Sequence, residues 1–406
     1  MCKITLLCHI LAIFLTGIMY KHIEFDPEES LNYCTRKLEK TLPSLPDPSR
    51  SPRNIPAGES AWSTVGIDDW TSGYFPGILW YAYEYTGDEK LGQQAARFTR
   101  VLRSLPETVG NHDLGIMTFA SMANAYRLTG DTLYRNTLLR AAEKLSQLYN
   151  PVVGTIHSWP YMVKSKGWPH NTIIDNMINI ELLFWAARNG GDRRFYDIAC
   201  KHARTTLANQ FRDDFSTYHV VVYDTISGKA IRQITHQGYA DSSMWARGQA
   251  WAVYGFTTAY RESREPDFLH AAQRAADIYL KRLPDDGIPY WDFDDPAIPG
   301  APKDASAAAV MASGLIELSR LSEDEKSRHI YREAAEKMLG TLSSESYRSG
   351  DTNQAFLLHC VGHKPHGSEI DASIVYGDYY YIEALMRLFR EKNNGHRPIK
   401  RILTDN

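Results

Sequence analysis

The chain has 406 residues, of which 43% are hydrophobic and 23% are charged, a composition typical of a folded globular protein and not of a disordered or fibrous one. A total of 45 Lys and Arg against 48 Asp and Glu leaves a net charge of −3, so the overall charge provides no basic field for DNA or RNA. We therefore expect no nucleic-acid partner. Aromatic residues reach 12%, which suits a protein that packs rings against flat apolar faces, sugars included.

The first twenty residues are mostly apolar and resemble the hydrophobic region of a signal peptide. The run is shorter than the roughly 20 apolar residues of a spanning helix, and no clear cleavage site follows it. Three interpretations of residues 1–20 follow, in decreasing order of preference: a cleaved signal, a signal anchor or an apolar helix. Membrane association is expected only through these residues. The location stays open. A secreted or signal-anchored protein is favoured over a cytoplasmic one, although the chain has no N-glycosylation sequon.

Residues 21–58 are predicted to form an N-terminal extension with a Pro-rich segment. Residues 42–60 contain Pro, Ser, Asp and Gly in a mixture typical of irregular structure. The compact body is expected over residues 59–392, and a polar tail over residues 393–406.

Helical periodicity dominates the chain beyond residue 78, where apolar residues recur at spacings of three and four. The clearest helical stretches are 116–127, 176–188, 248–260 and 305–318. Related turns follow such stretches at 85–88, 128–131, 189–192 and, more loosely, 264–267. In each turn a Gly or Pro is expected to end one helix and an Asp to cap the next.

The turns recur at about the length of a helical hairpin, which predicts stacked helix pairs in an open solenoid or a closed α/α toroid. The only strands predicted are residues 217–223 and 230–235, which form a β-hairpin inserted between helices. The fold class is therefore all-α, with this hairpin as a small addition.

Two aspartates stand out beside predicted helices. Asp113 directly precedes an apolar helix, where a simple N-cap is the commoner explanation. Asp175 lies among mostly apolar neighbours. It is either a buried cap or a carboxyl whose pKa is raised by desolvation, so that it acts as an acid near neutral pH.

The densest polar segment covers residues 235–251. Arg247 and Trp251 are four residues apart, so a helix places on one face a guanidinium that binds carboxylates and a ring that stacks on sugars. A salt bridge between helices beside a core Trp explains the pair equally well. His219 is the only His in the predicted hairpin, and a structural role is the commoner explanation for a single His.

His359, His363 and His366 lie near Cys360, so zinc has to be considered. Their spacing fits no common four-ligand pattern, and no metal site is expected. The chain also lacks a Walker A motif, a dinucleotide-binding fingerprint and a Gly-x-Ser-x-Gly elbow. We therefore expect neither a metal nor another cofactor.

Four blocks carry a family resemblance: DWTSGYFPGILWYAYEYTGD from residue 69, NHDLGIM from 111, IIDNMINIELLFWA from 173 and THQGYADSSMWARGQAWAVYGF from 235. Together they resemble the unsaturated glucuronyl hydrolases of glycoside hydrolase family 88, over about Glu59 to Leu388. The resemblance implies an (α/α)6 barrel, a toroid of six helical hairpins, as the catalytic domain over residues 59–392.

The resemblance also implies an activity. Such a glycosidase hydrates the C4=C5 double bond of the unsaturated uronic acid at the non-reducing end of lyase-generated oligosaccharides, of glycosaminoglycan type, and releases that sugar as a keto acid. Asp175 is then the general acid/base, and Asp113 binds ring hydroxyls and tunes its partner. The residues implied to bind unsaturated uronyl oligosaccharides are Trp70, His112, His219, Thr235, Gln237, Arg247 and Trp251. Lys364 and His366 are expected to set the tolerance for sulfated leaving sugars.

Two alternatives stay open. The nearer one is the sister activity of family 105 on unsaturated galacturonyl-rhamnose, against which the pair of His112 and Asp113 with His-Gln-Gly argues. The other is a catalytically silent carbohydrate-binding toroid, because fold does not determine function. Both aspartates and Arg247 argue against a silent protein.

Overall fold

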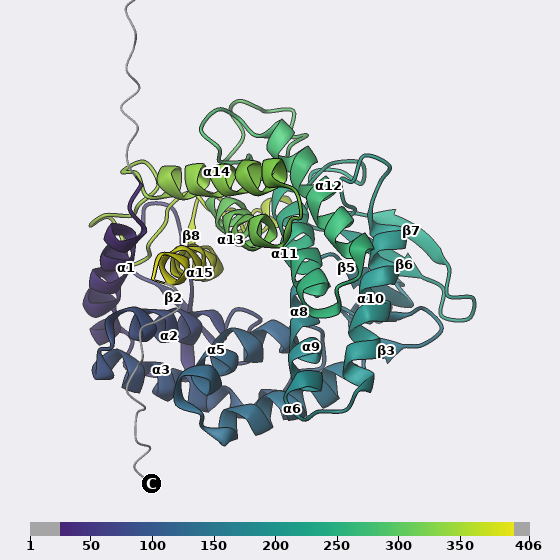
Figure 1. Cartoon of the computed structure of the whole chain (residues 1–406), viewed down its shortest axis with the longest axis horizontal. Coiled ribbons are helices and arrows are strands. Elements are labelled where there is room, and N and C mark those ends of the chain that lie inside the picture. Colours follow the sequence, from purple (N-terminus) through teal and green to yellow (C-terminus); the bar gives the residue numbers. More distant parts are fainter. Residues whose placement is uncertain (1–24, 394–406) are drawn as a thin grey trace, which may run out of the picture.

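The computed structural model describes residues 25–393, which form a ring of helices (Figure 1). The expected signal or anchor segment and almost all of the expected polar tail lie outside the described residues. Between residues 25 and 393, no helix is both long and apolar enough to cross a lipid bilayer.

An inner ring of helices forms the wall of the barrel. Its members are α2 (Tyr74–Thr86), α5 (Leu114–Thr129), α8 (Asn176–Asn179) continued by α9 (Glu181–Arg188), α11 (Ala246–Ser263), α13 (Ala305–Leu321) and α15 (Val375–Lys392). The ring closes because α15 packs against α2. The inner helices α11, α13 and α15 are buried on nearly all sides, since they contact both their neighbours in the ring and an outer helix.

An outer ring covers the inner one. Its members are α1 (Pro27–Thr41), α3 (Glu89–Val101), α6 (Thr132–Ser146), α10 (Arg194–Gln210), α12 (Pro266–Arg282) and α14 (Glu325–Leu342). Helix α1 packs on α15 through the buried residues Leu31, Cys34 and Leu38, and so completes the sixth helical pair. The architecture is an (α/α)6 barrel, as expected, and the segment predicted as an N-terminal extension provides one of its outer helices.

The turns that join inner to outer helices confirm the predicted caps at two of the four positions, and at 189–192 the cap residues are Asn189 and Arg193 instead of a Gly and Asp192. Gly87 and Gly130 end their helices in the left-handed conformation, and the side chains of Asp88 and Asp131 cap the next helices. The turn at 264–267 differs, because Arg264 takes the left-handed position and the Pro opens α12 instead of ending α11. The predicted helix 176–188 is present as two helices, α8 and α9.

Short helical turns and three small sheets make up the remaining regular structure. The short helices are η1 (Leu42–Ser44), η2 (Leu102–Ser104), α4 (Leu105–Thr108), α7 (Met162–Lys166) and η3 (Lys364–His366). The strands are β1 (Arg50–Ile55), β2 (Ser63–Gly66), β3 (Tyr149–Asn150), β4 (Thr155–Ile156), β5 (His170–Ile173), β6 (Val220–Tyr223), β7 (Ala230–Ile234) and β8 (Ser373–Ile374). The sheet orders are β2-β1-β8, β3-β4 and β5-β6-β7, all antiparallel.

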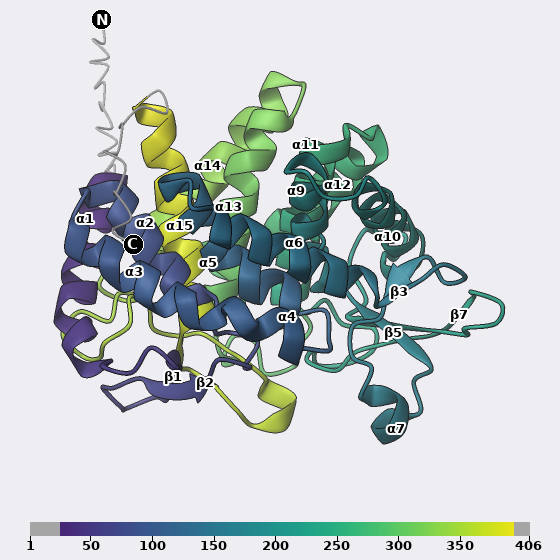
Figure 2. The ribbon, with the colours of Figure 1, turned by 90° about the horizontal axis from the view of Figure 1, so that it is seen from below.

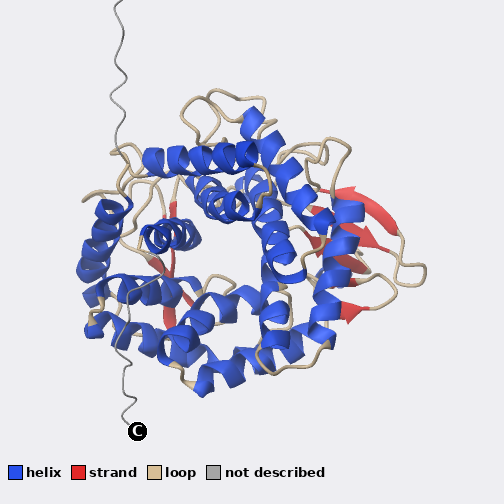
Figure 3. Ribbon diagram, viewed as in Figure 1, coloured by secondary structure: helices blue, strands red, loops and turns tan. Residues whose placement is uncertain are grey.

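The predicted hairpin is confirmed as β6 and β7, but the prediction of no further strands was wrong. Strand β1 lies within the Pro-rich segment and pairs with β8, more than 300 residues later in the chain. Such pairing is decided by tertiary contacts and not by local alternation of residues. Figure 3 shows that the strands lie in the connections and that one sheet lies outside the helical ring beside α10.

The two ends of the barrel differ in their connections. The inner helices run parallel, and their N-terminal ends are reached through the long loops that contain the strands. Figure 2 shows β1, β2, β5, β7 and α7 gathered at this end. The opposite end has the short turns from inner to outer helices.

Candidate active site

Asp113 and Asp175 lie directly before inner helices, at the end of the barrel with the long loops. Asp113 precedes α5 and Asp175 precedes α8, yet neither side chain makes a capping hydrogen bond. Each side chain is 18% exposed. The simple N-cap explanation therefore does not hold for either residue.

Asp175 faces a neutral histidine. Its Oδ2 lies 3.5 Å from Nε2 of His219. The other ring nitrogen, Nδ1, accepts hydrogen bonds from the backbone N–H groups of His236 and Gln237, both at 3.0 Å. Because Nδ1 is the acceptor, the proton of the neutral ring is on Nε2, the ring nitrogen that lies near Asp175. Burial lowers the pKa of His219 well below its usual value, which keeps the ring neutral.

Asp113 has the same kind of neighbour. Its Oδ1 lies 3.3 Å from Nε2 of His112. Nδ1 of His112 is 3.1 Å from the amide nitrogen of Asn179, which can only donate, so the ring proton is again on Nε2. Burial lowers the pKa of His112 to about 3. Both aspartates are thus met by an imidazole N–H and not by a positive charge.

A close approach of α5 and α8 brings the two aspartates near each other. A Cβ at Gly115 would lie 2.6 Å from the carbonyl oxygen of Asn179, so only glycine fits between the helices. The side chain of Asn179 also accepts a hydrogen bond of 2.7 Å from the N–H of Ile116. In this arrangement the charge of Asp113 raises the pKa of Asp175.

Burial raises the pKa of both carboxyl groups to about 7. For Asp113, the negative charge of Asp69 adds to the effect of burial. For Asp175, burial outweighs the positive charge of Arg247, which acts in the opposite direction. The charge of Asp113 adds a smaller effect in the same direction as burial on Asp175. A carboxyl with this pKa is partly protonated at neutral pH, as a general acid has to be.

Several buried polar atoms around the aspartates have no hydrogen-bond partner within residues 25–393. They are Nε2 of His112, Nε2 of His219 and the hydroxyl oxygen of Tyr376. Proteins satisfy most of their buried polar groups, so such a group of exceptions calls for an explanation. These donors and acceptors suit a polar ligand with several hydroxyl groups.

Arg247 is buried and is bonded to the protein itself. Its guanidinium lies 3.2 Å from Oδ2 of Asp304 and donates to the carbonyl oxygens of Val361 and Gly362. The salt bridge between helices that the sequence left open is therefore present, between α11 and the residue before α13. Arg247 acts on Asp175 through its charge, which lowers the pKa of that carboxyl.

The two predicted stacking tryptophans differ in exposure. Trp70 is half-buried, and its ring lies 5.1 Å from that of Tyr376, so part of its surface stays accessible. Trp251 is 1% exposed and meets Tyr380 at a ring distance of 5.2 Å. Little ring surface is left on Trp251 for a sugar, and its expected substrate contact rests on the indole N–H.

Thr235 and Gln237 lie in the turn after β7. Oγ1 of Thr235 accepts a hydrogen bond of 2.8 Å from the N–H of Gly238, and its N–H donates to Asp241 at 2.8 Å. The backbone N–H of Gln237 holds His219 in place. The observed role of this turn is therefore to orient the histidine that faces Asp175.

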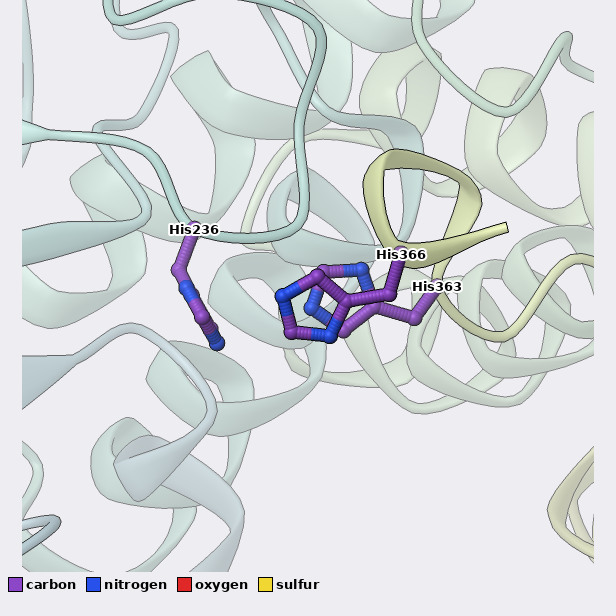
Figure 4. A group of neighbouring side chains, drawn as sticks. All are labelled: His236, His363 and His366. Atoms are coloured by element: carbon purple, nitrogen blue, oxygen red, sulfur yellow. The ribbon is translucent and has the colours of Figure 1, made fainter. Parts of the chain in front are cut away.

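The C-terminal loop brings two histidines against this turn (Figure 4). The rings of His363 and His366 are stacked at 3.7 Å, and the ring of His236 meets their edges at 5.0 and 5.2 Å. Burial lowers the pKa of His363 to about 3 and that of His236 to about 4, so both rings are neutral. The group differs from the one considered in the sequence, because His236 takes the place of His359 and Cys360.

The remaining residues of that loop lie apart from the three histidines or pair with carboxylates. His359 lies 2.5 Å from a carboxylate oxygen of Asp371, and Cys360 is fully buried. The ammonium of Lys364 lies 3.0 Å from Asp295. The positive charge expected to meet sulfated sugars is therefore partly compensated within the protein.

Three residues of the site were missed in the sequence. Asn179 lies four residues after Asp175, which places both on one helical face and is a usable signal. Asp69 lies in a quoted block, but its effect on Asp113 depends on folding. Trp159 contacts the rings of His112 and His219 at 6.2 and 5.9 Å, and nothing local in the sequence indicated it.

An (α/α)6 barrel with two protonatable aspartates among aromatic side chains defines a class, the helical-barrel glycosidases. The sequence model of Glycosyl Hydrolase Family 88 matches residues 54–388 of the chain. The chain therefore belongs to glycoside hydrolase family 88 and is a glycosidase. Of the two families considered in the sequence, the matched model is the one of family 88.

Curated relatives and solved structures agree with this membership. The unsaturated glucuronyl hydrolase of Formosa agariphila is 42% identical, over 83% of this chain and 84% of the relative. The unsaturated chondroitin disaccharide hydrolase of Streptococcus pneumoniae is 32% identical, over 90% of this chain and 92% of the relative. The crystal structure of an unsaturated glucuronyl hydrolase specific for heparin has a TM-score of 0.85 and 40% identity, over 91% of this chain and 98% of that one.

Proposed function

We propose that this glycosidase adds water across the C4=C5 double bond of an unsaturated uronic acid at the non-reducing end of a glycosaminoglycan-type oligosaccharide. The observation that carries the proposal is the pair of buried aspartates, Asp113 and Asp175, whose pKa is raised to about 7 beside neutral histidines. An enol ether is hydrated by acid catalysis, which requires a protonated group at neutral pH.

Asp175 is the proposed acid/base. Its proton is transferred to C4, a water molecule adds to C5, and the proton lost by that water returns to the carboxylate. The product is a hemiketal at C5, which opens to a ketone and frees the hydroxyl at C1. The resulting hemiacetal expels the next sugar, so the sum of the steps is the addition of one water molecule.

Asp113 is proposed to accept hydrogen bonds from the ring hydroxyls of the unsaturated sugar. Its carboxyl lies near Asp175, and its charge raises the pKa of that residue. Asp113 therefore keeps its partner protonated as well as orienting the sugar. The rule that relates carboxylate separation to inversion or retention does not apply here, because the attacked carbon is C5 and not the anomeric carbon.

The negative carboxylate of the substrate has a suitable environment at this end of the barrel. The long inner helices α2, α5, α11, α13 and α15 begin here, and a helix N-terminus has a partial positive charge. Arg247 adds a full positive charge nearby. The ring of Trp70, which is half-buried beside Tyr376, is available to the sugar.

The test is the loss of ultraviolet absorbance of the conjugated double bond when the protein is mixed with an unsaturated chondroitin, hyaluronan or heparin disaccharide. We expect decay with the parent protein and a loss of about 10²- to 10⁴-fold in the Asp175→Asn variant. The exposed Asp197→Asn serves as the matched control, because its side chain is 67% exposed.

Decay at the parent rate in Asp175→Asn would remove that residue from the proposed role. An absence of decay with the parent protein on all three disaccharides would overturn the proposed function.

A further inference from the structure

His236, His363 and His366 form a compact group at the edge of the site (Figure 4). Each ring offers one nitrogen, and these three nitrogens all lie within 4.8 Å of one another. We propose that this group binds a transition-metal ion such as Zn²⁺ and that the ion links the turn after β7 to the C-terminal loop.

The chemistry of the donors fits such an ion. Three imidazoles with an open fourth position are a common environment for zinc, copper or nickel. Both ring nitrogens of His363 are buried and have no hydrogen-bond partner among residues 25–393, so they are available as ligands. Zinc binds imidazole nitrogen at about 2.0–2.1 Å, so the stacked rings of His363 and His366 have to rotate apart to share one ion.

The surroundings make the site weak and reversible rather than structural. No carboxylate belongs to the group. The positive charges of Lys166 and Arg247 act on His236 and His363, respectively, and oppose the entry of a cation. The charge of Lys364 is compensated by Asp295. We therefore expect an affinity below that of structural zinc sites, in the micromolar range of dissociation constants.

The position of the group predicts inhibition when the metal is bound. The backbone N–H of His236 donates to Nδ1 of His219, whose other ring nitrogen faces Asp175. The rings of His236 and His219 are 6.3 Å apart. An ion held by the three histidines would fix both loops beside the proposed acid. The inhibition rests on the proposed function, whereas metal binding itself does not.

The experiment measures binding and activity separately on the full chain. Titration with Co²⁺ followed by visible absorbance, and with Zn²⁺ followed by calorimetry, should show one ion bound to these histidines. The His366→Asn and His236→Asn variants should each lose at least tenfold in affinity. His329→Asn is the matched control, because its side chain is 70% exposed on α14, and it should bind as the parent does.

Equal affinities of the parent and His366→Asn for the ion would overturn the proposal. The side chain of His366 is exposed, so its replacement should not prevent folding. Asp175→Asn should lose activity and keep full metal binding, so a failure of the proposed function is distinguishable from a failure of the metal site. If the parent protein binds Zn²⁺ but hydrates the disaccharide at an unchanged rate, the proposed inhibition is wrong. The proposed metal site is then retained.

Discussion

The pKa values of buried carboxyl groups at the two ends of the inner helices are shifted in opposite directions. Glu84 and Glu317, near the C-terminal ends of α2 and α13, are 14% and 12% exposed, and their pKa is lowered to about 2. Asp113 and Asp175, before α5 and α8, are 18% exposed, and their pKa is raised to about 7. Carboxyl groups with similar burial thus have pKa values that are shifted in opposite directions.

The partners explain the difference. Burial by itself raises the pKa of Glu317, but the charges and hydrogen bonds of Arg387 and Arg261 outweigh it. The two aspartates have no arginine bonded to them among the described residues, and their histidine neighbours are neutral. The end with the ion pairs joins α11, α13 and α15 together. At the other end, Asp113 and Asp175 have no such arginine partner among the described residues and stay partly protonated at neutral pH.

Replacement of Glu317 by Ala should show the largest effect on stability. Removing Glu317 takes from Arg261 and Arg387 the carboxylate that they share, while Glu181, Glu262 and Glu383 remain as partners. The cost in the free energy of unfolding should therefore approach, but not exceed, the about 3–5 kcal/mol of a fully broken buried pair. Chemical denaturation followed by circular dichroism measures this loss. Glu333→Ala, at a position 65% exposed, should change stability by about 0.5 kcal/mol or less. Equal losses in the two variants would contradict the structural role of the network.

The pH profile of the reaction tests the raised pKa of Asp175. Because Asp175 acts in its protonated form and its pKa is about 7, kcat/KM should fall as the pH rises through this value, by about tenfold per unit. Initial rates on one unsaturated disaccharide between pH 5 and about 9 measure the profile. A rate that stays constant above pH 7 would show that the carboxyl group is not the acid.

Removal of the charge at Asp175 should stabilise the protein in a pH-dependent way. The pKa of this carboxyl is raised above the value of the unfolded chain, so its favourable contribution is complete at low pH and is lost as the pH rises through about 7. Asp175→Asn should therefore raise Tm at pH 8 and leave it nearly unchanged at pH 4. The stabilisation at pH 8 should be about 1–3 kcal/mol. Scanning calorimetry at both pH values tests this, and a lower Tm at pH 8 would contradict it.

The smallest effect, a change in substrate preference, is expected from a substitution in the C-terminal loop. Lys364 is paired with Asp295, and such partly exposed pairs contribute about 0–1 kcal/mol. Lys364→Ala should reduce the preference for sulfated over unsulfated unsaturated chondroitin disaccharide by about threefold. The ratio of the two kcat/KM values measures it. An unchanged ratio would remove Lys364 from leaving-sugar recognition.

Local patterns were sufficient for several inner helices and for two of the four predicted turns. Apolar spacing located α5, α11 and α13, and Gly87 and Gly130 with their following aspartates marked helix ends correctly. These signals depend on residues that are a few positions apart in the chain, so they can be recognised without the tertiary structure. Strand β1 was missed because it lies in a Pro-containing segment that is typical of irregular structure, although it pairs both with the nearby β2 and with the distant β8.

The sequence by itself determined the helical architecture and the family motifs, and its resemblance to the family made Asp113 and Asp175 the candidate catalytic residues. Only the tertiary structure decided how these aspartates are charged, because their pKa depends on burial and on neutral histidines that come from other segments. It also decided that Arg247 is bonded to Asp304 and that His236 joins His363 and His366. Such contacts depend on distance in space, which the order of residues along the chain does not express.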